Sequence, residues 1–179
     1  MLTAIPVTKN NFHEVKALYL VAFPKQEQVP FPFLVSKTKN PNMQFLAYYH
    51  DTTFVGLTYT VTHEDITYLW YLATDSNLRS QGYGSQIMQH LAAIFPQQRI
   101  VLNLDVEDPT AKDSEIRKKR KQFYINNGYQ TMPYKCNFNG NKLDIMTING
   151  TLAPEEFAPI FKKFFGPILY LFHKPKILK

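Results

Sequence analysis

Two glycines separated by one residue lie in a basic loop, in the segment Arg79-Ser80-Gln81-Gly82-Tyr83-Gly84 that Ser85 follows. An apolar, aromatic run that favours a strand precedes the loop, and apolar residues at helical spacing follow it. Glycine lets backbone N–H groups approach a ligand closely, and the start of a helix adds a partial positive charge. The arrangement therefore predicts an anion site that is best suited to phosphate groups.

Two common nucleotide sites do not fit this loop. The dinucleotide-binding fingerprint needs a third glycine, and this chain has Ile87 at that position. The triphosphate-binding loop ends in Gly-Lys-Ser/Thr, and that ending is absent here. The glycine spacing by itself therefore leaves the ligand open.

Apolar periodicity along the chain predicts one mixed sheet with helices packed on it. Strands are expected at 2–7, 44–50, 54–61, 66–74, 100–104, 130–135 and 143–148, and helices at 11–22, 82–95, 114–126 and 151–165. Asn139-Gly140 is a strong hairpin signal between the last two strands. Residues 23–33 alternate three prolines with aromatic residues, fit no regular element, and are expected either to line a pocket or to cap the core.

Length and composition indicate one globular domain. The chain has 179 residues, of which 45% are hydrophobic and 15% aromatic, with a formal net charge of +6. The single cysteine, Cys136, excludes an intrachain disulfide, and no secretory signal is visible, so we expect a soluble cytoplasmic protein. We expect the main domain over 1–150 and a C-terminal helical extension over 151–179, packed on or beside it.

Two motifs in register resemble the GNAT superfamily of N-acetyltransferases. The run from Leu72 to Gly84 resembles the family's central Arg/Gln-x-x-Gly-x-Gly/Ala signature after a buried strand. The run Phe123-Tyr124-Ile125-Asn126-Asn127-Gly128-Tyr129 resembles the family's aromatic-Tyr-x-x-x-Gly-aromatic helix ending. The element order matches as well, from residue 2 to residue 150. The resemblance implies an α/β (α+β) fold in which helices flank a mixed, mostly antiparallel central sheet.

The resemblance also implies acetyl-CoA as co-substrate, a primary amine as acceptor and no metal. Backbone N–H groups of the loop would hold the coenzyme pyrophosphate, with added charge from an arginine, and the strand edge before it would pair with the pantetheine amides. The coenzyme-binding residues implied in this way are Leu72, Ala73, Thr74, Arg79, Ser80, Gln81, Gly82, Tyr83, Gly84 and Ser85.

The resemblance implies that Tyr124 protonates the departing thiolate, although an aromatic residue at this position could also serve only the core. Many members carry a glutamate base on the strand before the glycine loop, where this chain has Tyr68 and Trp70. Glu27, in the proline-rich segment, is therefore the candidate base, followed by Glu64, and either could be a solvated surface residue. The asparagine that many members place seven residues before the tyrosine is replaced by Arg117.

The sequence also indicates which partners to expect. Glu27 and the aromatic segment favour a small amine over a protein acceptor, and no membrane partner is expected. The run from Arg117 to Lys121 could be a solvated face, could contact coenzyme phosphates, or could bind nucleic acid. No accompanying motif favours the nucleic-acid interpretation. The aromatic C-terminal segment could cover the sheet or pair two subunits. The last lysines, Lys174, Lys176 and Lys179, are expected to form a frayed, solvated tail. The alternative functions are a non-catalytic acyl-CoA-binding or sensing protein and, less favoured, a basic nucleic-acid-binding domain.

Overall fold

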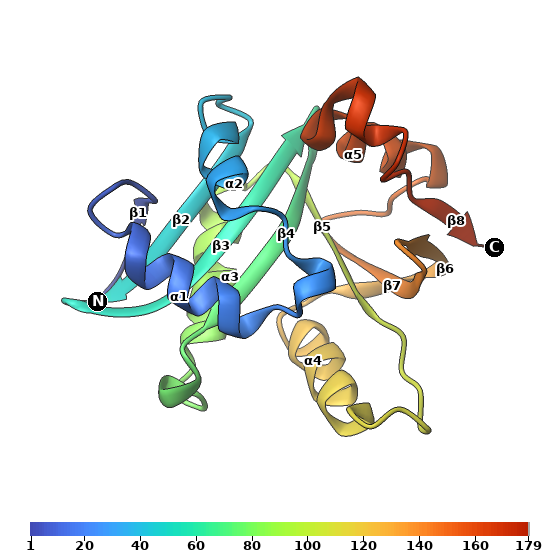
Figure 1. The fold of residues 1–179 in the computed structure, drawn as a ribbon. Coiled ribbons are helices and arrows are strands. Elements are labelled where there is room, and N and C mark those ends of the chain that lie inside the picture. Colours follow the sequence, from blue (N-terminus) through green and yellow to red (C-terminus); the bar gives the residue numbers. More distant parts are fainter. Residues whose placement is uncertain (179) are drawn as a thin grey trace. The chain divides into compact units, whose positions relative to one another are not determined.

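The computed structural model describes residues 1–178, which form a β-sheet and several helices (Figure 1). The strands are β1 (Leu2–Pro6), β2 (Met43–His50), β3 (Thr53–His63), β4 (Ile66–Thr74), β5 (Arg99–Asp105), β6 (Gln130–Phe138), β7 (Asn141–Ile148) and β8 (Lys176–Leu178). The α-helices are α1 (Phe12–Ala22), α2 (Phe31–Lys37), α3 (Tyr83–Ile94), α4 (Ser114–Asn126) and α5 (Pro154–Tyr170), and the short 3-10 helices are η1 (Lys25–Glu27) and η2 (Ser76–Leu78). The strand order in the sheet is β1-β2-β3-β4-β5-β7-β6-β8.

The first of two compact units consists of residues Met1–Val61 and Leu69–Ile94. Its strands follow the order β1-β2-β3-β4, and the β1–β2 and β2–β3 pairs are antiparallel. In Figure 1, α1 crosses in front of these strands and α3 lies behind them. Ring contacts agree with this placement, because Tyr19 of α1 packs on Tyr71 of β4, and His90 of α3 packs on Tyr48 of β2. The strands are therefore buried on two faces, which explains their long apolar runs.

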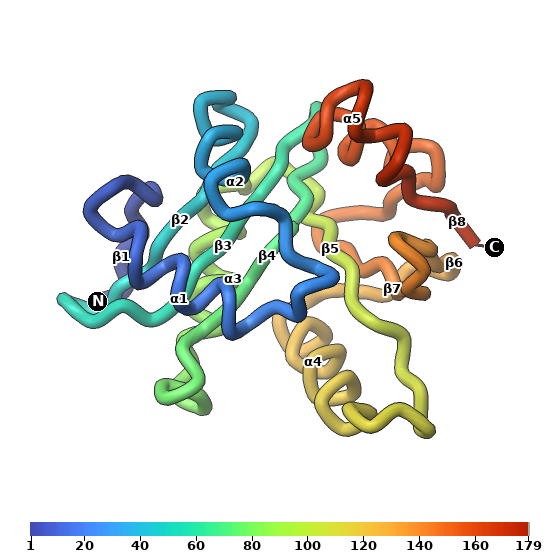
Figure 2. Tube along the Cα trace, viewed as in Figure 1, coloured from blue at the N-terminus to red at the C-terminus, as the bar shows by residue number. Residues whose placement is uncertain are grey.

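The second unit consists of Thr62–Tyr68 and the chain from Phe95 onward, so β4 runs through both units. The first residues of β4 pair in parallel with β5, from Ile66 with Arg99 to Tyr68 with Val101. The β5–β7, β7–β6 and β6–β8 pairs are antiparallel. Figure 2 shows α5 and α4 at opposite sides of this group of strands. The sheet is thus mixed and mostly antiparallel, as the sequence predicts.

Arg99 joins three parts of the second unit through its guanidinium group. It pairs with Asp65 in the β3–β4 turn through Nε at 2.8 Å and with Glu156 of α5 through Nη2 at 2.7 Å. It also donates to the Thr151 carbonyl at 2.8 Å. Glu156 in turn accepts from the backbone N–H of Ala153, which satisfies one free donor at the start of α5. This network fixes the first turn of α5 against the start of β5.

The predicted elements are confirmed with few exceptions. Strand 66–74 and helix 114–126 match to the residue, and the Asn139-Gly140 hairpin has positive φ at both positions. The expectation that 23–33 contains no regular element is wrong, because α2 begins at Phe31 and buries Phe31 and Leu34. Proline is tolerated there, since the first helical residues need no N–H partner.

The C-terminal lysines do not form a frayed tail throughout. Lys176 lies in β8, which pairs antiparallel with β6, and Lys174 precedes that strand; Lys179 lies outside the described residues. A three-residue strand is too short for a periodicity signal, which is why the sequence did not predict it. None of the helices in residues 1–178 is long and apolar enough to cross a membrane.

Gly56 of β3 lets the strand pass close to the end of β4. A Cβ atom at this position would lie 2.5 Å from the Ala73 carbonyl oxygen and 3.0 Å from Cδ1 of Ile87 in α3. Beside it, a β-bulge shifts the β2–β3 register, and the Val55 carbonyl accepts a hydrogen bond from the Asp75 N–H. Gly56 and Val55 therefore position both the last residues of β4 and the turn that follows.

Replacing Gly56 with alanine should lower the free energy of unfolding by about 2–3 kcal/mol, because a methyl group would overlap a backbone oxygen that cannot rotate away. Urea unfolding measures this loss. Gly140→Ala is the matched control, since a Cβ there has nothing within 4 Å and adds only about 1 kcal/mol of backbone strain. A loss at Gly56 no greater than the loss at Gly140 would contradict the assignment.

Candidate active site

The glycine loop begins at an anchored turn. The Asp75 N–H donates to the Val55 carbonyl at 3.0 Å, and the Asp75 carboxylate accepts from the N–H of Asn77 at 2.8 Å, which caps η2. Both bonds hold the chain where it leaves β4. The loop residues Arg79, Ser80, Gln81 and Gly82 that follow are exposed, so a ligand can reach them.

Backbone geometry in the loop leaves several N–H groups available. Ser80 and Gly82 have positive φ values of 62° and 79°, a region that glycine adopts readily. The first helical bond of α3 runs from the Gln86 N–H to the Gly82 carbonyl, at 3.1 Å. Within residues 1–178 the N–H groups of the three preceding residues, Tyr83, Gly84 and Ser85, find no acceptor. Three free donors at the start of a twelve-residue helix suit an anion.

Arg79 adds positive charge to this loop. Its side chain is exposed and forms no ion pair with any residue that the structure describes. Among the residues that the sequence singled out, Arg79 through Ser85 are thus brought together in one accessible turn. This arrangement can neutralise a phosphate group both by charge and by backbone donors.

The strand residues predicted to bind the pantetheine arm lie at the end of β4. In the first unit, β4 is the last strand of the order, and Leu72, Ala73 and Thr74 lie just before Asp75. Ala73 is buried, whereas Leu72 and Thr74 are half-buried. Such alternation is typical of a strand whose two faces are covered to different degrees.

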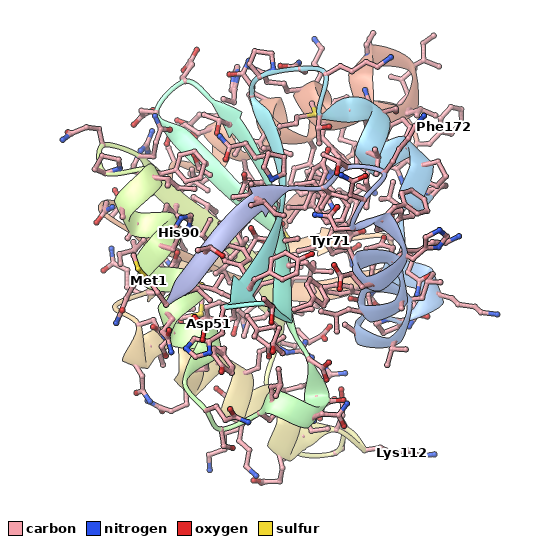
Figure 3. All side chains as sticks on the ribbon, turned by 90° about the vertical axis from the view of Figure 1, so that its left-hand side faces the viewer. Met1, Asp51, Tyr71, His90, Lys112 and Phe172 are labelled. Carbon is pink, nitrogen blue, oxygen red and sulfur yellow. The ribbon has the colours of Figure 1, made fainter. Side chains whose placement is uncertain are left out.

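Two tyrosine hydroxyls hold the α1–α2 segment, residues 23–30: Tyr71 ties it to β4, and Tyr19 ties it to α1. The Tyr71 hydroxyl donates to the Glu27 carbonyl at 2.6 Å and accepts from the Val29 N–H at 3.2 Å. The Tyr19 hydroxyl forms a reciprocal pair with Val29, donating to its carbonyl at 2.9 Å and accepting from its N–H at 2.8 Å. Figure 3 shows Tyr71 in the interior, and both rings are buried. The segment therefore has a fixed position beside the strand that ends in the glycine loop.

Glu27 lies in η1 of this tethered segment and is exposed. Its backbone is fixed through Tyr71, and its negative charge contributes to raising the pKa of the Tyr19 hydroxyl, behind the larger effect of burial. The carboxylate is thus held on the side of the first unit where α1 lies. Strand β4 itself contains no aspartate or glutamate. Tyr68, at one of the positions where many family members have a glutamate, packs on Phe157 and Phe161 of α5.

Tyr124 lies in the last turn of α4, in the second unit. It is buried and contacts Phe123 and Tyr129 edge to face. Burial raises the pKa of the Tyr124 hydroxyl to about 12, and the charge of Arg120 offsets part of this effect. The phenol therefore stays protonated through neutral and mildly alkaline pH, as a proton donor must.

Ion pairs account for most of the basic run on α4. Arg117 pairs with Asp113 at 2.9 Å, Lys121 pairs with the buried carboxylate of Asp144 at 2.9 Å, and Arg120 lies 3.8 Å from Asp105. The remaining members, Lys118 and Lys119, are exposed. The five charges are therefore divided between internal pairs and solvent and do not form one stripe.

Cys136 is fully buried in β6, where it accepts a hydrogen bond from the Asn103 side chain. Burial raises the pKa of its thiol to about 12, so no thiolate forms at neutral pH. Cys136 is therefore a core residue and is unsuited to carry a covalent acyl group. Among residues 1–178, no group of three His, Cys, Asp or Glu side chains could hold a metal ion.

Sequence reasoning did not predict the roles of Gly56, Tyr19 and Tyr71. One signal was available, because a tyrosine inside an otherwise apolar strand must find a partner for its hydroxyl. The identity of that partner depends on a loop 42 or more residues away along the chain, which no local pattern specifies.

The chain belongs to the acetyltransferase (GNAT) family, whose sequence model matches residues 12–114. The matched region contains the glycine loop and the strands that precede it. Comparison with curated protein sequences finds no match.

Solved structures of this family share the fold. A GNAT-family protein from Bacteroides thetaiotaomicron aligns with a TM-score of 0.70 and 21% identity over 86% of this chain and 90% of its own. The ribosomal-protein-S18-alanine N-acetyltransferase from Escherichia coli aligns with a TM-score of 0.64 and 14% identity, over 88% and 99%. An aminoglycoside 6′-N-acetyltransferase complexed with coenzyme A aligns with a TM-score of 0.66 and 17% identity, over 85% of this chain and 99% of its own.

A double-mutant cycle tests the tyrosine tether. Tyr19→Phe and Tyr71→Phe should each lower the free energy of unfolding by about 1–3 kcal/mol. The double variant should lose at least about 0.5 kcal/mol more than the sum, because the Val29 N–H then has neither hydroxyl as acceptor. Urea unfolding of the four proteins measures the coupling.

Tyr48→Phe combined with Tyr71→Phe is the control pair. The Tyr48 hydroxyl is buried and interacts with Thr58 at 3.2 Å, and it does not contact Val29. The loss of unfolding free energy in Tyr48→Phe should therefore simply add to the loss in Tyr71→Phe. Simple additivity in the Tyr19 and Tyr71 cycle would show that the two hydroxyls do not share one tether.

Proposed function

We propose that this protein transfers the acetyl group of acetyl-CoA to a primary amine by direct attack in a ternary complex. The observation that carries the proposal is the exposed glycine loop, in which three consecutive N–H groups at the start of α3 have no acceptor within the described residues. The match of residues 12–114 to the acetyltransferase family supports the same reaction class.

The loop fits the coenzyme pyrophosphate by shape and by charge. The N–H groups from Gln81 through Ser85 would donate to phosphate oxygens, and Arg79 would supply a full positive charge. A left-handed backbone at Gly82 keeps the loop compact, with nothing but Gln86 within 4 Å of the position where a Cβ would lie. Backbone approach to the phosphates is therefore unobstructed.

The end of β4 would hold the pantetheine arm. Strand-like pairing with the backbone of Leu72, Ala73 and Thr74 would place the thioester next to fixed N–H groups. An N–H group that donates to the thioester oxygen stabilises the negative charge that develops there during attack. The contact of Gly56 with Ala73 fixes this strand end, and that supports its use as a template.

The chemical step forms a C–N bond and breaks a C–S bond. The amine lone pair attacks the thioester carbonyl carbon, and the coenzyme leaves as a thiolate when the tetrahedral intermediate collapses. We assign Tyr124 as the acid that gives its phenolic proton to sulfur, which its protonated state at neutral pH supports. Glu27, directly or through water, takes the proton that the ammonium ion must lose before its nitrogen can attack. The proton that the nitrogen loses after attack returns through solvent to the Tyr124 phenolate.

For the acceptor, we propose a small cationic amine. Glu27 places a carboxylate in a segment that Tyr71 tethers to β4 and Tyr19 tethers to α1, and Phe23 in the same segment packs on Tyr71. A negative group beside aromatic faces attracts an ammonium ion. Structural relatives are named for acceptors of both kinds, an aminoglycoside and a ribosomal protein. The unpaired thiol of Cys136 supports a reducing, cytoplasmic location.

Acetyl-CoA should raise the melting temperature, and coenzyme A should be released when amines are supplied. Gly82→Ala should weaken acetyl-CoA binding about tenfold, because a Cβ strains the left-handed backbone by about 1–2 kcal/mol. Calorimetry measures the affinity, and a thiol reagent detects released coenzyme A across a panel of small amines.

Gly140→Ala is the control, since it replaces another glycine with positive φ (86°) in the β6–β7 turn. The affinity of Gly140→Ala for acetyl-CoA should match that of the unchanged protein. Binding without release in the presence of any amine would favour a non-catalytic acyl-CoA-binding protein. The absence of any thermal shift with acetyl-CoA would refute both functions.

Tyr124→Phe and Glu27→Gln should each lower kcat about 100-fold while the Kd for acetyl-CoA stays unchanged, because each variant removes a proton donor or acceptor. Because the pKa of Tyr124 is about 12, no decline of kcat/KM caused by Tyr124 is expected below about pH 10. Steady-state kinetics as a function of pH measures these effects.

Gln26→Ala is the control for Glu27, as an exposed neighbour in η1. Full activity of Tyr124→Phe across the pH range would reject the acid assignment. Full activity of Glu27→Gln would assign proton removal to another group.

A further inference from the structure

The positive charge of this chain is concentrated at its C-terminus. Residues 157–179 contain five lysines (162, 163, 174, 176 and 179) and no Asp or Glu. Since the whole chain has 20 basic and 14 acidic residues, residues 1–156 contribute 15 and 14 and are almost neutral. Five of the six excess charges therefore lie in this last segment.

The same segment exposes large apolar side chains. We name residues Pro167–Phe172 the C-terminal projection. Ile168, Leu171 and Phe172 are 73%, 75% and 77% exposed, and Leu169 is 43% exposed. These four exposed apolar side chains, which fall within five residues of sequence, are called the apolar patch; surface hydrophobic residues more often occur singly.

A break in α5 directs these side chains outward. Gly166 has φ 77° and ψ 168°, values outside the helical region, and Pro167 follows it. Before the break, Phe157, Ile160, Phe161 and Phe164 face the core and are fully buried. After it the apolar residues no longer continue that face. The exposure therefore results from the backbone geometry at Gly166.

The projection is held at both ends. On one side Phe165 is buried, and on the other His173 stacks on the Phe165 ring at 4.6 Å and lies 3.4 Å from the Asn139 side chain. Strand β8 then pairs with β6. The apolar patch is thus a fixed feature of the surface.

Lysines accompany the patch without internal partners. Lys162, Lys174 and Lys176 are exposed, Lys163 is half-buried, and none forms an ion pair with a described residue. Apolar side chains next to unpaired lysines match the two layers of a bilayer surface, where anionic headgroups cover acyl chains. We propose that the C-terminal projection docks the protein on an anionic membrane surface, with Ile168, Leu171 and Phe172 inserted among the lipids.

The charge of this segment favours a lipid surface over a second copy of the chain or a nucleic acid. A second copy of the chain would bring two segments of charge +5 together, and like charges repel. Nucleic acid would pair with the lysines but would leave the apolar side chains in water. The sequence expectation of no membrane partner took no account of the exposure that the break at Gly166 creates. The proposal goes beyond acetyl transfer and does not depend on it.

Sedimentation of the full chain with unilamellar vesicles tests the proposal. Vesicles of phosphatidylcholine mixed with phosphatidylserine should retain the protein, and vesicles of phosphatidylcholine alone should retain roughly tenfold less. The double variant Leu171→Ser/Phe172→Ser should lose roughly tenfold in partitioning, because its apolar anchors are gone. Lys174→Gln/Lys176→Gln should weaken binding and flatten its salt dependence.

Leu20→Ser/Val21→Ser is the matched control, since both residues are exposed and apolar but lie on α1. It should bind as the unchanged protein does, and thermal melting confirms that every variant is folded. No retention by either vesicle would overturn the proposal, as would equal loss in the control. Dimerisation in light scattering that Leu171→Ser/Phe172→Ser abolishes, without vesicle binding, would assign the patch to a second copy.

Discussion

The backbone of β3 passes so close to the end of β4 that no side chain fits between them. A Cβ on Gly56 would lie 2.5 Å from the Ala73 carbonyl and 3.0 Å from Ile87 of α3, so one missing side chain sets the spacing of a strand, its neighbour and the helix that follows. At the neighbouring bulge, the Val55 carbonyl accepts a hydrogen bond from the N–H of Asp75, the first residue after β4. Because backbone atoms cannot rotate away from a clash, this packing fixes where the glycine loop begins.

Both halves of the proposed reaction use that fixed strand end. On one side, the loop from Arg79 to Ser85 offers charge and free backbone donors. On the other, Tyr71 reaches from β4 to the segment that carries Glu27. One strand therefore sets the position of the glycine loop directly and of residues 23–30 through the Tyr71 side chain. Hydroxyl groups suit the second task, since a buried phenol packs as a ring and still donates a hydrogen bond.

The fold and the exposed glycine loop were predictable, because local patterns encode both. A nearly continuous apolar run marks β4, and the two-glycine spacing with the Tyr124 motif indicates the family. The sequence did not predict α2, since Pro30 and Pro32 disguise a helix that begins among prolines. It also missed β8, whose three residues acquire strand structure only through pairing with β6.

The sequence by itself determined the class of protein, the loop that suits phosphate and the absence of a glutamate on β4. Each depends on residue type and short-range spacing, which folding does not alter. Only the tertiary structure decided which tyrosines hold the α1–α2 segment, that Arg117 and Lys121 are paired with carboxylates, and that Ile168, Leu171 and Phe172 face solvent. Those outcomes depend on which distant groups meet, and burial and hydrogen bonding between them are settled only when the chain has packed.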